Sequence, residues 1–524
     1  MLNLSLILDE SAKRYPGKTA FAFMDSQWSY RQVNDHANKV ANALIAMGIR
    51  HGDKVALTCP NIPAFPILYF GIIRPGAVVM PLSVLLKKDK IEYQLRDCEA
   101  KAYFCYVGTP ELPMGEMGQA AFKSVDECLH FILITPKAGT PLPLEGIDTF
   151  ESLIANQSSA ASIYPTSAED TCVIIYTSGT TGRPKGAELT HFNLWFIATV
   201  FADIFKSNKD DVTMLVLPLF HIFGMAVMMN TSVYRGCTNV LLPRFDPLAV
   251  LQSLQNHQVT IFGGVPTMYW ALLNCRDGNV DDNAISKNLK VCVCGGASLP
   301  SKVIEGFEKR FNAPIMEGYG MSESTCAVTF NQLEIGRKAG SVGTPLPNVE
   351  VKLADSNGDE VQVGEKGELW YRGPNVMKGY YKKIEETATA LAGGWMHSGD
   401  IAVKDEDGFY YIVDRTKDMI IRAGMKIYPR EVEEVIIKHE AVSLVAIIGT
   451  AHEDLGEEVK AFVVLKENFS VTESELIQWT KERVASFKYP RSIEFIPAMP
   501  LSATGKILKK ELRNNQNERL QASG

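Results

Sequence analysis

Residues 171–186 read TCVIIYTSGTTGRPKG, and this stretch decides the fold. Its first six residues are mostly apolar or β-branched, which predicts a buried strand. The remainder combines three glycines and four hydroxyl side chains with Arg183 and Lys185. Glycines let a backbone curl close to a ligand, and clustered N–H groups with nearby cations favour a polyphosphate. The stretch therefore predicts a strand that ends in a phosphate-binding loop.

The loop differs from a Walker A loop, whose pattern is G-x-x-x-x-G-K followed by serine or threonine. Gly186 follows Lys185, so no hydroxyl stands where a Walker loop holds Mg²⁺. The alternative is a flexible linker rich in serine and glycine. We disfavour it because linkers rarely follow a buried strand and rarely carry so many phosphate-binding groups.

Short apolar runs alternate with helical stretches on both sides of the loop. These runs are residues 55–59, 78–81, 102–106, 212–217, 240–242, 259–262, 291–294 and 315–317. Strands that alternate with helices predict parallel sheets covered on both faces. From about residue 340, short strands separated by Asp- and Gly-rich turn signals predict an antiparallel, barrel-like region.

The C-terminal part of the chain has a compact α+β pattern. It predicts helices over residues 429–440 and 472–484 and strands over residues 442–449 and 459–465. The predicted fold class is α/β, with a large N-terminal region of two doubly wound α/β subdomains plus a β-barrel-like subdomain. A small mobile α+β C-terminal domain follows. The predicted domains are residues 1–415 and 416–524.

Composition excludes several classes of protein. The chain has 524 residues, 46% hydrophobic and 22% charged, as in globular proteins and unlike disordered or fibrous ones. Its net charge of −7 argues against binding a nucleic acid, which needs a basic surface. Ten scattered cysteines without a C-x-x-C pair predict reduced, buried thiols of a cytoplasmic protein. No two histidines have the H-x-x-x-H spacing of a zinc site.

Targeting and membrane signals are not recognisable in the sequence. The first residues lack the basic start and cleavage site of a signal peptide, and the last residues match no peroxisomal or ER-retention signal. The most apolar stretch, residues 214–229, is interrupted by Pro218 and Gly224 and is too short to span a bilayer. We expect a buried strand, turn and helix there. Peripheral membrane contact stays open.

Residues 176–186 resemble the signature loop of the adenylate-forming superfamily: acyl-CoA synthetases, luciferases and peptide-synthetase adenylation domains. The family's other motifs follow in order over the whole chain, which most resembles the fatty-acid CoA ligases. The resemblance implies binding of ATP and Mg²⁺, with Thr180 on the metal. It assigns ATP contacts in the loop to Thr177, Ser178, Gly179, Thr180, Thr181, Gly182 and Lys185.

Two strand-end motifs extend the resemblance. Residues 291–297 end in Gly-Gly-Ala, similar to the family's turn beside adenine; a plain strand-to-helix turn is the alternative. Residues 317–323, EGYGMSE, resemble the family's Tyr-Gly-x-Thr-Glu motif. By this resemblance the ATP contacts are Gly295, Gly296, Ala297, Glu317, Gly318, Tyr319 and Gly320.

The same motif implies catalytic and metal residues. Tyr319 stacks on adenine, Ser322 contacts the α-phosphate and the substrate carboxylate, and Glu323 helps to bind Mg²⁺, which prefers oxygen ligands. Serine replaces the usual threonine at position 322, which keeps the hydroxyl but loses a methyl group. We therefore expect changed positioning rather than lost activity. The alternative for Glu323 is a solvated carboxylate.

Two further positions resemble the family's ribose contacts. Asp400, in the sequence WMHSGD, would accept hydrogen bonds from both ribose hydroxyls, which suits a carboxylate. Arg415 matches the second ribose contact. Asp414 precedes it where glycine is frequent in the family, which raises a question about the local backbone.

The C-terminal motifs resemble a hinge and a mobile catalytic lysine. Lys417 matches the hinge between the domains, and Lys506 matches the lysine that reaches the reacting carboxylate during adenylation. Such a hinge lets one pocket first hold ATP and later admit a thiol. Gly424 matches the loop beside the CoA tunnel. Lys509 and Lys510 are expected to be solvated surface lysines.

Residues 217–225 and 262–269 resemble the walls of the family's acyl pocket. His221 matches the carboxylate end of that pocket; a packed core histidine is the alternative. The pocket residues implied are His221, Gly264, Val265, Met268 and Met321. Their apolar character suits an uncharged tail, although Met268 and Tyr269 could equally be core.

The resemblance implies an acid–thiol ligase that forms an acyl-adenylate and then an acyl-CoA, with a medium- or long-chain fatty acid as the expected substrate. An aryl-acid CoA ligase of the cinnamate or benzoate type and a fatty acyl-AMP ligase that serves a carrier protein are alternatives. A silent nucleotide-binding scaffold is a remote one. The expected partners are a carboxylic acid, ATP and CoA, and no nucleic acid; a homodimer stays open.

Overall fold

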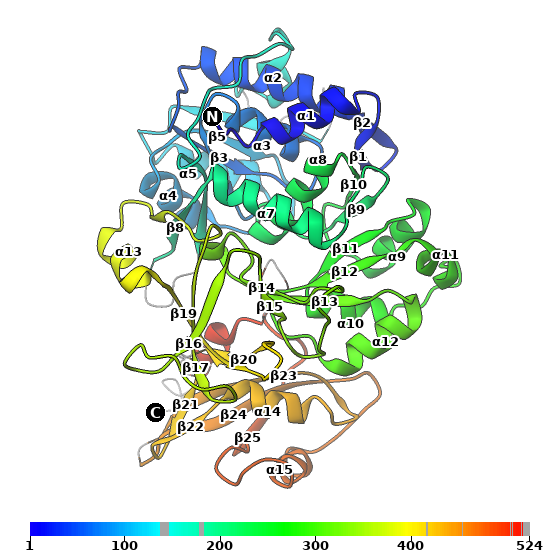
Figure 1. Ribbon diagram of the computed structural model, residues 1–524, viewed down its shortest axis with the longest axis vertical. Helices are drawn as coiled ribbons and strands as arrows, with labels where there is room; N and C mark the ends of the chain where they lie inside the picture. The colour runs from blue at the N-terminus through cyan, green and yellow to red at the C-terminus, as the bar shows by residue number, and fades with distance from the viewer. Residues whose placement is uncertain are drawn as a thin grey trace. The chain divides into compact units, whose positions relative to one another are not determined.

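The computed structural model describes residues 1–136, 146–177, 183–415, 418–452, 454–502, 505, 507–514 and 516. The chain forms two compact units. Figure 1 colours the chain by residue number, from the N-terminus to the C-terminus. The larger unit comprises Met1–Arg337, Pro345–Glu350 and Arg372–Gly394. The smaller unit comprises Lys338–Thr344, Val351–Tyr371 and Trp395–Gly524. The predicted boundary between residues 415 and 416 stays a prediction.

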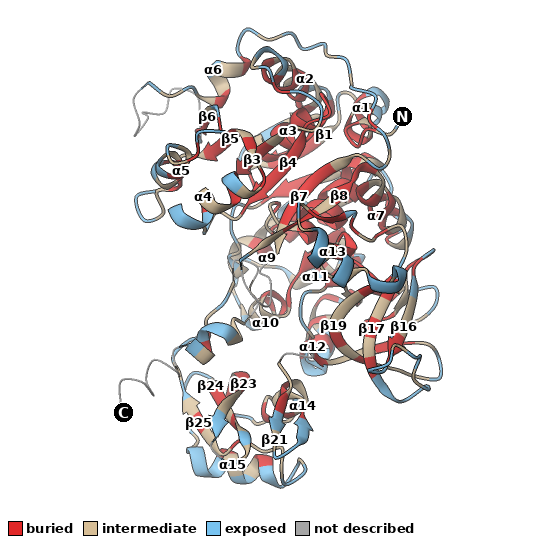
Figure 2. Cartoon of the chain, turned by 90° about the vertical axis from the view of Figure 1, so that its left-hand side faces the viewer, coloured by how far each residue is buried: buried red, intermediate tan, exposed pale blue. Residues whose placement is uncertain are grey.

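One sheet of the larger unit contains the two strands on either side of the glycine-rich loop. Its order is β18-β8-β7-β4-β3-β5-β6. The strands are β3 (Lys54–Thr58), β4 (Val78–Leu82), β5 (Ala100–Tyr106), β6 (His130–Ile134), β7 (Thr171–Thr177), β8 (Lys185–Thr190) and β18 (Gly379–Tyr380). All residues of β4 are buried, as expected of a parallel strand covered on both faces (Figure 2).

A second sheet of the larger unit follows the order β14-β13-β12-β11-β9-β10-β1-β2. Its strands are β1 (Thr19–Phe23), β2 (Ser26–Ser29), β9 (Val212–Leu215), β10 (Thr238–Leu241), β11 (Ile261–Gly264), β12 (Val291–Cys294), β13 (Ile315–Tyr319) and β14 (Thr329–Phe330). Strands β9 to β13 are parallel. In the register, Gly264 lies beside Cys294, and Cys294 lies beside Glu317. The carboxyl ends of β11, β12 and β13 therefore reach the same edge, where ligands bind in open α/β sheets.

Helices connect these strands. In the larger unit they are α1 (Leu6–Arg14), α2 (Tyr30–Ala46), α3 (Ala64–Ile73), α4 (Lys88–Asp97), α5 (Met114–Phe122), α6 (Phe150–Ile154), α7 (His191–Ile204), α8 (Thr231–Arg235), α9 (Pro247–Asn256), α10 (Pro266–Asn274), α11 (Asp282–Asn288), α12 (Ser301–Phe311) and α13 (Ile384–Ala390). Helices α9, α10 and α12 share a hydrophobic core with β9 to β13. The two sheets with their helices confirm the predicted α/β class.

The most apolar stretch forms a strand, a turn and a helix, as predicted. After β9 the chain turns and enters a π-helix over Phe223–Asn230, all of whose residues are buried. Single π-turns often mark functional sites. In the described part of the chain, we find no helix that is both long and apolar enough to cross a membrane.

The smaller unit contains two more sheets. The first has the order β16-β17-β19-β20, with β16 (Glu350–Ala354), β17 (Lys366–Arg372), β19 (Met396–Lys404) and β20 (Tyr410–Arg415). Strand β19 pairs antiparallel with both β17 and β20, as the turn signals predicted. The second contains β21 (Ile420–Arg422), β22 (Met425–Ile427), β23 (Val442–His452), β24 (Gly456–Leu465) and β25 (Ser492–Phe495). Helices α14 (Pro429–Ile436) and α15 (Glu473–Lys481) end earlier than predicted.

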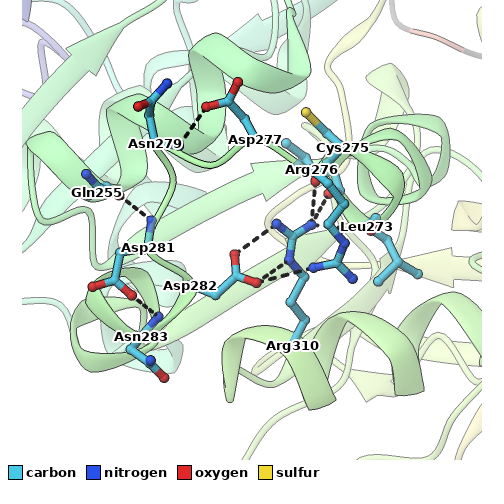
Figure 3. Close-up of polar contacts among 11 residues, drawn as sticks. Gln255, Leu273, Cys275, Arg276, Asp277, Asn279, Asp281, Asp282, Asn283 and Arg310 are labelled. Atoms are coloured by element: carbon cyan, nitrogen blue, oxygen red, sulfur yellow. Dashed lines mark hydrogen bonds and ion pairs between the residues drawn. The ribbon is translucent and has the colours of Figure 1, made fainter.

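Arg310 of α12 binds the end of helix α10 (Figure 3). Its guanidinium forms a two-pronged pair with Asp282, each contact at 2.8 Å. Nη1 also donates to the carbonyls of Leu272 at 2.7 Å and Cys275 at 2.8 Å. The side chain is 6% exposed. One cation thus satisfies carbonyls that a helix end leaves without intrahelical partners.

We expect Arg310→Met to lower the free energy of unfolding of this region by about 3 kcal/mol, because the helix end and Asp282 lose a largely buried partner. Arg276 provides a matched control, since it contacts the same carboxylate at 3.3 Å but is 64% exposed. Arg276→Met should cost less than about 1 kcal/mol. Urea denaturation of the three proteins measures both effects. Equal urea midpoints for the two variants would contradict this role of Arg310.

Candidate active site

The glycine-rich loop connects two antiparallel strands, β7 and β8. Strand β7 confirms the predicted strand, and its last residue, Thr177, pairs with Lys185, the first residue of β8. The Thr177 hydroxyl also lies 3.5 Å from the Lys185 carbonyl oxygen. Ser178, Gly179, Thr180, Thr181 and Gly182 lie outside the described residues.

Aromatic rings lie beside both cations of this loop. The Lys185 ammonium is 4.3 Å from the centre of the Tyr380 ring. The Arg183 guanidinium is 5.6 Å from the Tyr93 ring, and the Tyr93 hydroxyl donates to the Pro184 carbonyl at 2.8 Å. A ring face attracts a cation without neutralising it. Both residues therefore keep their charge for an anionic ligand.

The carboxyl ends of β11 and β12 meet the start of the π-helix. A Cβ atom at Gly295 would lie 3.6 Å from the Phe223 ring and 3.5 Å from the Gly318 carbonyl oxygen. A Cβ atom at Gly296 would lie 3.9 Å from Val265. Gly296 has φ +84°, which glycine adopts without strain. The structure thus brings together parts of four predicted motifs, residues 217–225, 262–269, 291–297 and 317–323. Gly296 and Ala297 are exposed.

The predicted acyl-pocket residues differ in burial. Val265 and Met268, at the start of α10, are 7% and 6% exposed, whereas Met321 is partly exposed. Gly264 ends β11 beside them. Tyr269 is fully buried in the hydrophobic core and donates to the Val293 carbonyl at 2.8 Å. The core interpretation therefore holds for Tyr269.

His221 is partly exposed and precedes the π-helix, so it is not a packed core histidine. Its position depends on Asn61, which the sequence analysis missed. The Asn61 amide donates to the carbonyls of Leu215 and Leu217, and its oxygen accepts from the Leu219 N–H, each at 2.9 Å. Asn61 is 1% exposed. It fixes the segment between β9 and His221.

The turn after β13 is tightly packed. A Cβ atom at Gly320 would lie 1.9 Å from the Cys326 carbonyl oxygen, and one at Gly318 would lie 2.4 Å from the Phe330 ring. Thr325 and Cys326 both have positive φ angles, of 50° and 93°. Only glycine fits at these two close approaches. The turn therefore holds residues 318–323 in one conformation.

Side chains of this turn divide into exposed and buried groups. Tyr319 and Ser322 are partly exposed, whereas Glu317 and Glu323 are each 5% exposed. The Glu317 carboxylate accepts from the Leu299 N–H at 3.2 Å. The Glu323 carboxylate accepts from the Tyr380 hydroxyl at 2.9 Å, so it is not a solvated carboxylate. Buried carboxylates need such partners.

In the smaller unit, Asp400 and Arg415 are cross-strand neighbours on β19 and β20. Asp400 is 7% exposed, and its N–H donates to the Ser398 hydroxyl at 3.1 Å. Asp414 accepts from the Arg430 N–H at 2.9 Å, near the start of α14. Its φ angle is not positive, so the strand needs no glycine at that position. This settles the backbone question that Asp414 raised.

The hinge and the catalytic lysine, Lys417 and Lys506, lie outside the described residues. Gly424 is exposed at the turn between β21 and β22, with φ +77°. Lys509 is not a solvated lysine: it forms an ion pair with Glu433 at 2.7 Å and is 19% exposed. Lys510 is exposed, as expected.

Comparison with known families gives two matches along the chain. Residues 8–381 match the family described as AMP-binding enzyme, and residues 431–506 match the AMP-binding enzyme C-terminal domain. The long-chain-fatty-acid–CoA ligase of Bacillus subtilis is 35% identical over 98% of this chain and 95% of its own length. A feruloyl-CoA synthase from an Amycolatopsis species is 35% identical over 96% of both chains.

Solved structures with similar folds include two ligand complexes. An anthranilate CoA ligase in complex with anthranoyl-AMP has a TM-score of 0.88 and 28% identity, over 98% of this chain and 97% of that one. ATP-bound MatB from Rhodopseudomonas palustris has a TM-score of 0.88 and 28% identity, over 98% of this chain and 99% of that one.

Proposed function

Because the chain belongs to the AMP-binding enzyme family, the adenylate-forming acyl-CoA ligases, we propose that it converts a medium- or long-chain fatty acid to its CoA thioester. The proposal rests on the edge of the second sheet at which β11, β12 and β13 end. There, Val265 and the glycines of residues 295–296 lie beside a tightly packed turn that carries Glu323. Apolar and anion-binding groups together suit a fatty acid and ATP.

The first step is attack on the α-phosphate of ATP by a substrate carboxylate oxygen. A P–O bond forms to the acid, the bond to the β-phosphate oxygen breaks, and pyrophosphate leaves. Lys185 and the N–H groups of its loop bind the phosphates, and the Ser322 hydroxyl orients the α-phosphate. Tyr319 stacks on adenine, and Asp400 and Arg415 bind the ribose.

The buried, acceptor-only carboxylate of Glu323 suits Mg²⁺, and Thr180 is its proposed companion. When bound, the ion supplies positive charge to the departing pyrophosphate. Glu323 would provide one carboxylate oxygen as a ligand of the ion, at the edge of the site. In the second step, the CoA thiol attacks the acyl carbonyl, the C–O bond to phosphate breaks, and AMP leaves. Gly424 is the proposed residue on the CoA side.

An aryl acid is the second candidate substrate. The feruloyl-CoA synthase is as similar to this chain as the bacterial fatty-acid ligase, at 35% identity. A structural neighbour is named as a benzoate CoA ligase, with a TM-score of 0.86. Met268 and Met321 suit either substrate, because flexible thioether side chains fit both alkyl chains and aromatic rings.

Pyrophosphate release with a panel of acids, with and without CoA, tests the function. The panel contains acetate, octanoate, palmitate, benzoate and ferulate, and thioester formation is measured in parallel. We expect release with octanoate or palmitate, and thioester only when CoA is present. Release with ferulate alone would favour the aryl-acid ligase. Release without thioester would indicate an acyl-AMP ligase, and no release with any acid would overturn the enzyme assignment.

We expect Lys417→Pro to separate the two half-reactions. Proline fixes φ near about −65° and removes a hinge torsion, so the C-terminal domain should keep one orientation. Thioester formation should fall more than about tenfold while pyrophosphate release stays within about twofold. Lys417→Ala is the control, since it removes the ammonium and keeps the torsion free. Normal thioester formation by the proline variant would argue against a hinge at this residue.

A further inference from the structure

Residues 373–381, which we call the strap, hold the turn that carries Glu323. The Met377 N–H donates to the Glu323 carbonyl at 2.8 Å. The Asn375 amide donates to the Ala327 carbonyl at 2.7 Å. Asn375 is fully buried. The strap is therefore bound at two points of the turn after β13, at Glu323 in its middle and at Ala327 near its end.

The same strap is bound to the strand that begins with Lys185. Its last part is β18, whose residues Gly379 and Tyr380 pair antiparallel with β8. The Lys378 N–H donates to the Glu188 carbonyl at 2.9 Å, and the Tyr381 N–H donates to the Gly186 carbonyl at 2.8 Å. The backbone of the strap thus joins β8, the strand that begins with Lys185, to the turn that carries Glu323.

Tyr380 contacts the functional side chain on each side of the strap. Its hydroxyl donates to Glu323 Oε1 at 2.9 Å, and its ring centre lies 4.3 Å from the Lys185 ammonium. The residue is 8% exposed. In this hydrogen bond the Tyr380 hydroxyl is the donor, because an ionised carboxylate can only accept.

This arrangement gives two opposite charges separate partners. A direct ion pair between Lys185 and Glu323 would use the ammonium and the carboxylate that the proposed reaction needs for phosphate and metal. A neutral hydroxyl occupies only part of a carboxylate's accepting capacity and leaves its charge intact. A ring face likewise leaves the ammonium charged.

We propose that Tyr380 is a positioning residue that holds the Glu323 carboxylate and the Lys185 ammonium apart, each oriented for its own part of MgATP. This role rests on the proposed function. The two contacts of Tyr380, with Glu323 and with Lys185, are separable by mutation. Tyr380→Phe removes the hydroxyl and keeps the ring, whereas Tyr380→Leu removes both.

The test is the Mg²⁺ dependence of ATP binding, measured by calorimetry on the full chain. For Tyr380→Phe, the Mg²⁺ concentration that gives half-maximal ATP binding should rise about tenfold, because Glu323 loses its hydrogen bond. Its ATP affinity at saturating Mg²⁺ should stay within about twofold, because Lys185 keeps the ring. For Tyr380→Leu, ATP affinity at saturating Mg²⁺ should also fall, by about fivefold.

The adjacent Tyr381 provides the matched control. Its hydroxyl donates to Glu99 at 2.9 Å, away from Glu323, so Tyr381→Phe loses an equivalent hydrogen bond. It should leave the Mg²⁺ dependence unchanged. Identical profiles for the two phenylalanine variants would overturn the role of Tyr380, as would a loss of thermal stability in Tyr380→Phe with no change in Mg²⁺ dependence.

A double-mutant cycle shows whether Tyr380 acts through Glu323. In a Glu323→Gln background, Tyr380→Phe should cause no further change in Mg²⁺ dependence; an undiminished effect would overturn the role.

Failure of the proposed function can be distinguished from failure of the role of Tyr380. A wild type that binds MgATP but releases pyrophosphate with no acid overturns the function, and binding still measures Tyr380. A wild type that binds no MgATP overturns both.

Discussion

Replacing Lys506 with alanine should lower acid-dependent pyrophosphate release by about 10²- to 10³-fold, the loss typical of removing one preorganised donor from a charge-stabilising site. In the proposed first step, negative charge from the carboxylate and the α-phosphate is brought to one point. A lysine that contacts both groups offsets this repulsion and holds them in line. The measurement is the single-turnover rate of pyrophosphate release with the preferred acid.

The second half-reaction distinguishes a catalytic loss from general damage. When acyl-adenylate and CoA are supplied, Lys506→Ala should form thioester at close to the wild-type rate, because adenylation is bypassed. Lys510→Ala is a suitable control, since Lys510 is exposed and follows Lys506 by four residues in the sequence. Lys509 is unsuitable because its ion pair with Glu433 anchors it to α14. Equal loss of both half-reactions would contradict the assignment of Lys506 to adenylation.

The α/β fold could be predicted because burial on both faces leaves a strong signal in the sequence. Strand β7 was predicted over residues 171–176 and is observed over Thr171–Thr177. Helix ends were less accurate: α14 ends at Ile436, four residues before the predicted end. The apolar spacing that predicts a helix does not mark the residue at which it stops.

The candidate site was predictable where its residues follow buried strands. Gly295 and Tyr319 stand at the ends of β12 and β13, and parallel register then brings such residues to one edge. Tyr380 and Asn61 were missed because their contacts are distant in sequence. β18 contains only two residues, which is too short for any periodic pattern. Asn61 follows strand β3, and only its position after a buried strand could have drawn attention to it.

Burial also changed the interpretation of individual lysine and cysteine side chains. Lys509 carries no signal that separates it from Lys510, yet it pairs with Glu433, whose Oε1 also accepts from the Ile447 N–H at 2.7 Å. Eight of the ten cysteines are buried, while Cys275 and Cys326 are partly exposed. Side-chain environment of this kind depends on tertiary neighbours and has no local sequence pattern.

Gly320→Ala should abolish pyrophosphate release almost completely, by more than about 10²-fold, because the turn that carries Ser322 and Glu323 must move. The added Cβ would lie 1.9 Å from the Cys326 carbonyl oxygen, which is backbone and cannot rotate away. Relieving the clash should also cost about 1–3 kcal/mol of stability, as in other overpacked sites. Pyrophosphate release and urea denaturation of the purified variant measure the two losses.

The size of the effect depends on which atom the new methyl group meets. Gly278 offers the comparison, because a Cβ atom there has no neighbour within 4 Å and its φ is not positive. Gly278→Ala should therefore leave both activity and stability unchanged. Gly320 also lies outside the positive-φ region, so its requirement is steric rather than torsional. If Gly320→Ala kept wild-type activity, the turn would have room to shift, and Glu323 could not owe its position to the packing of residues 318–327.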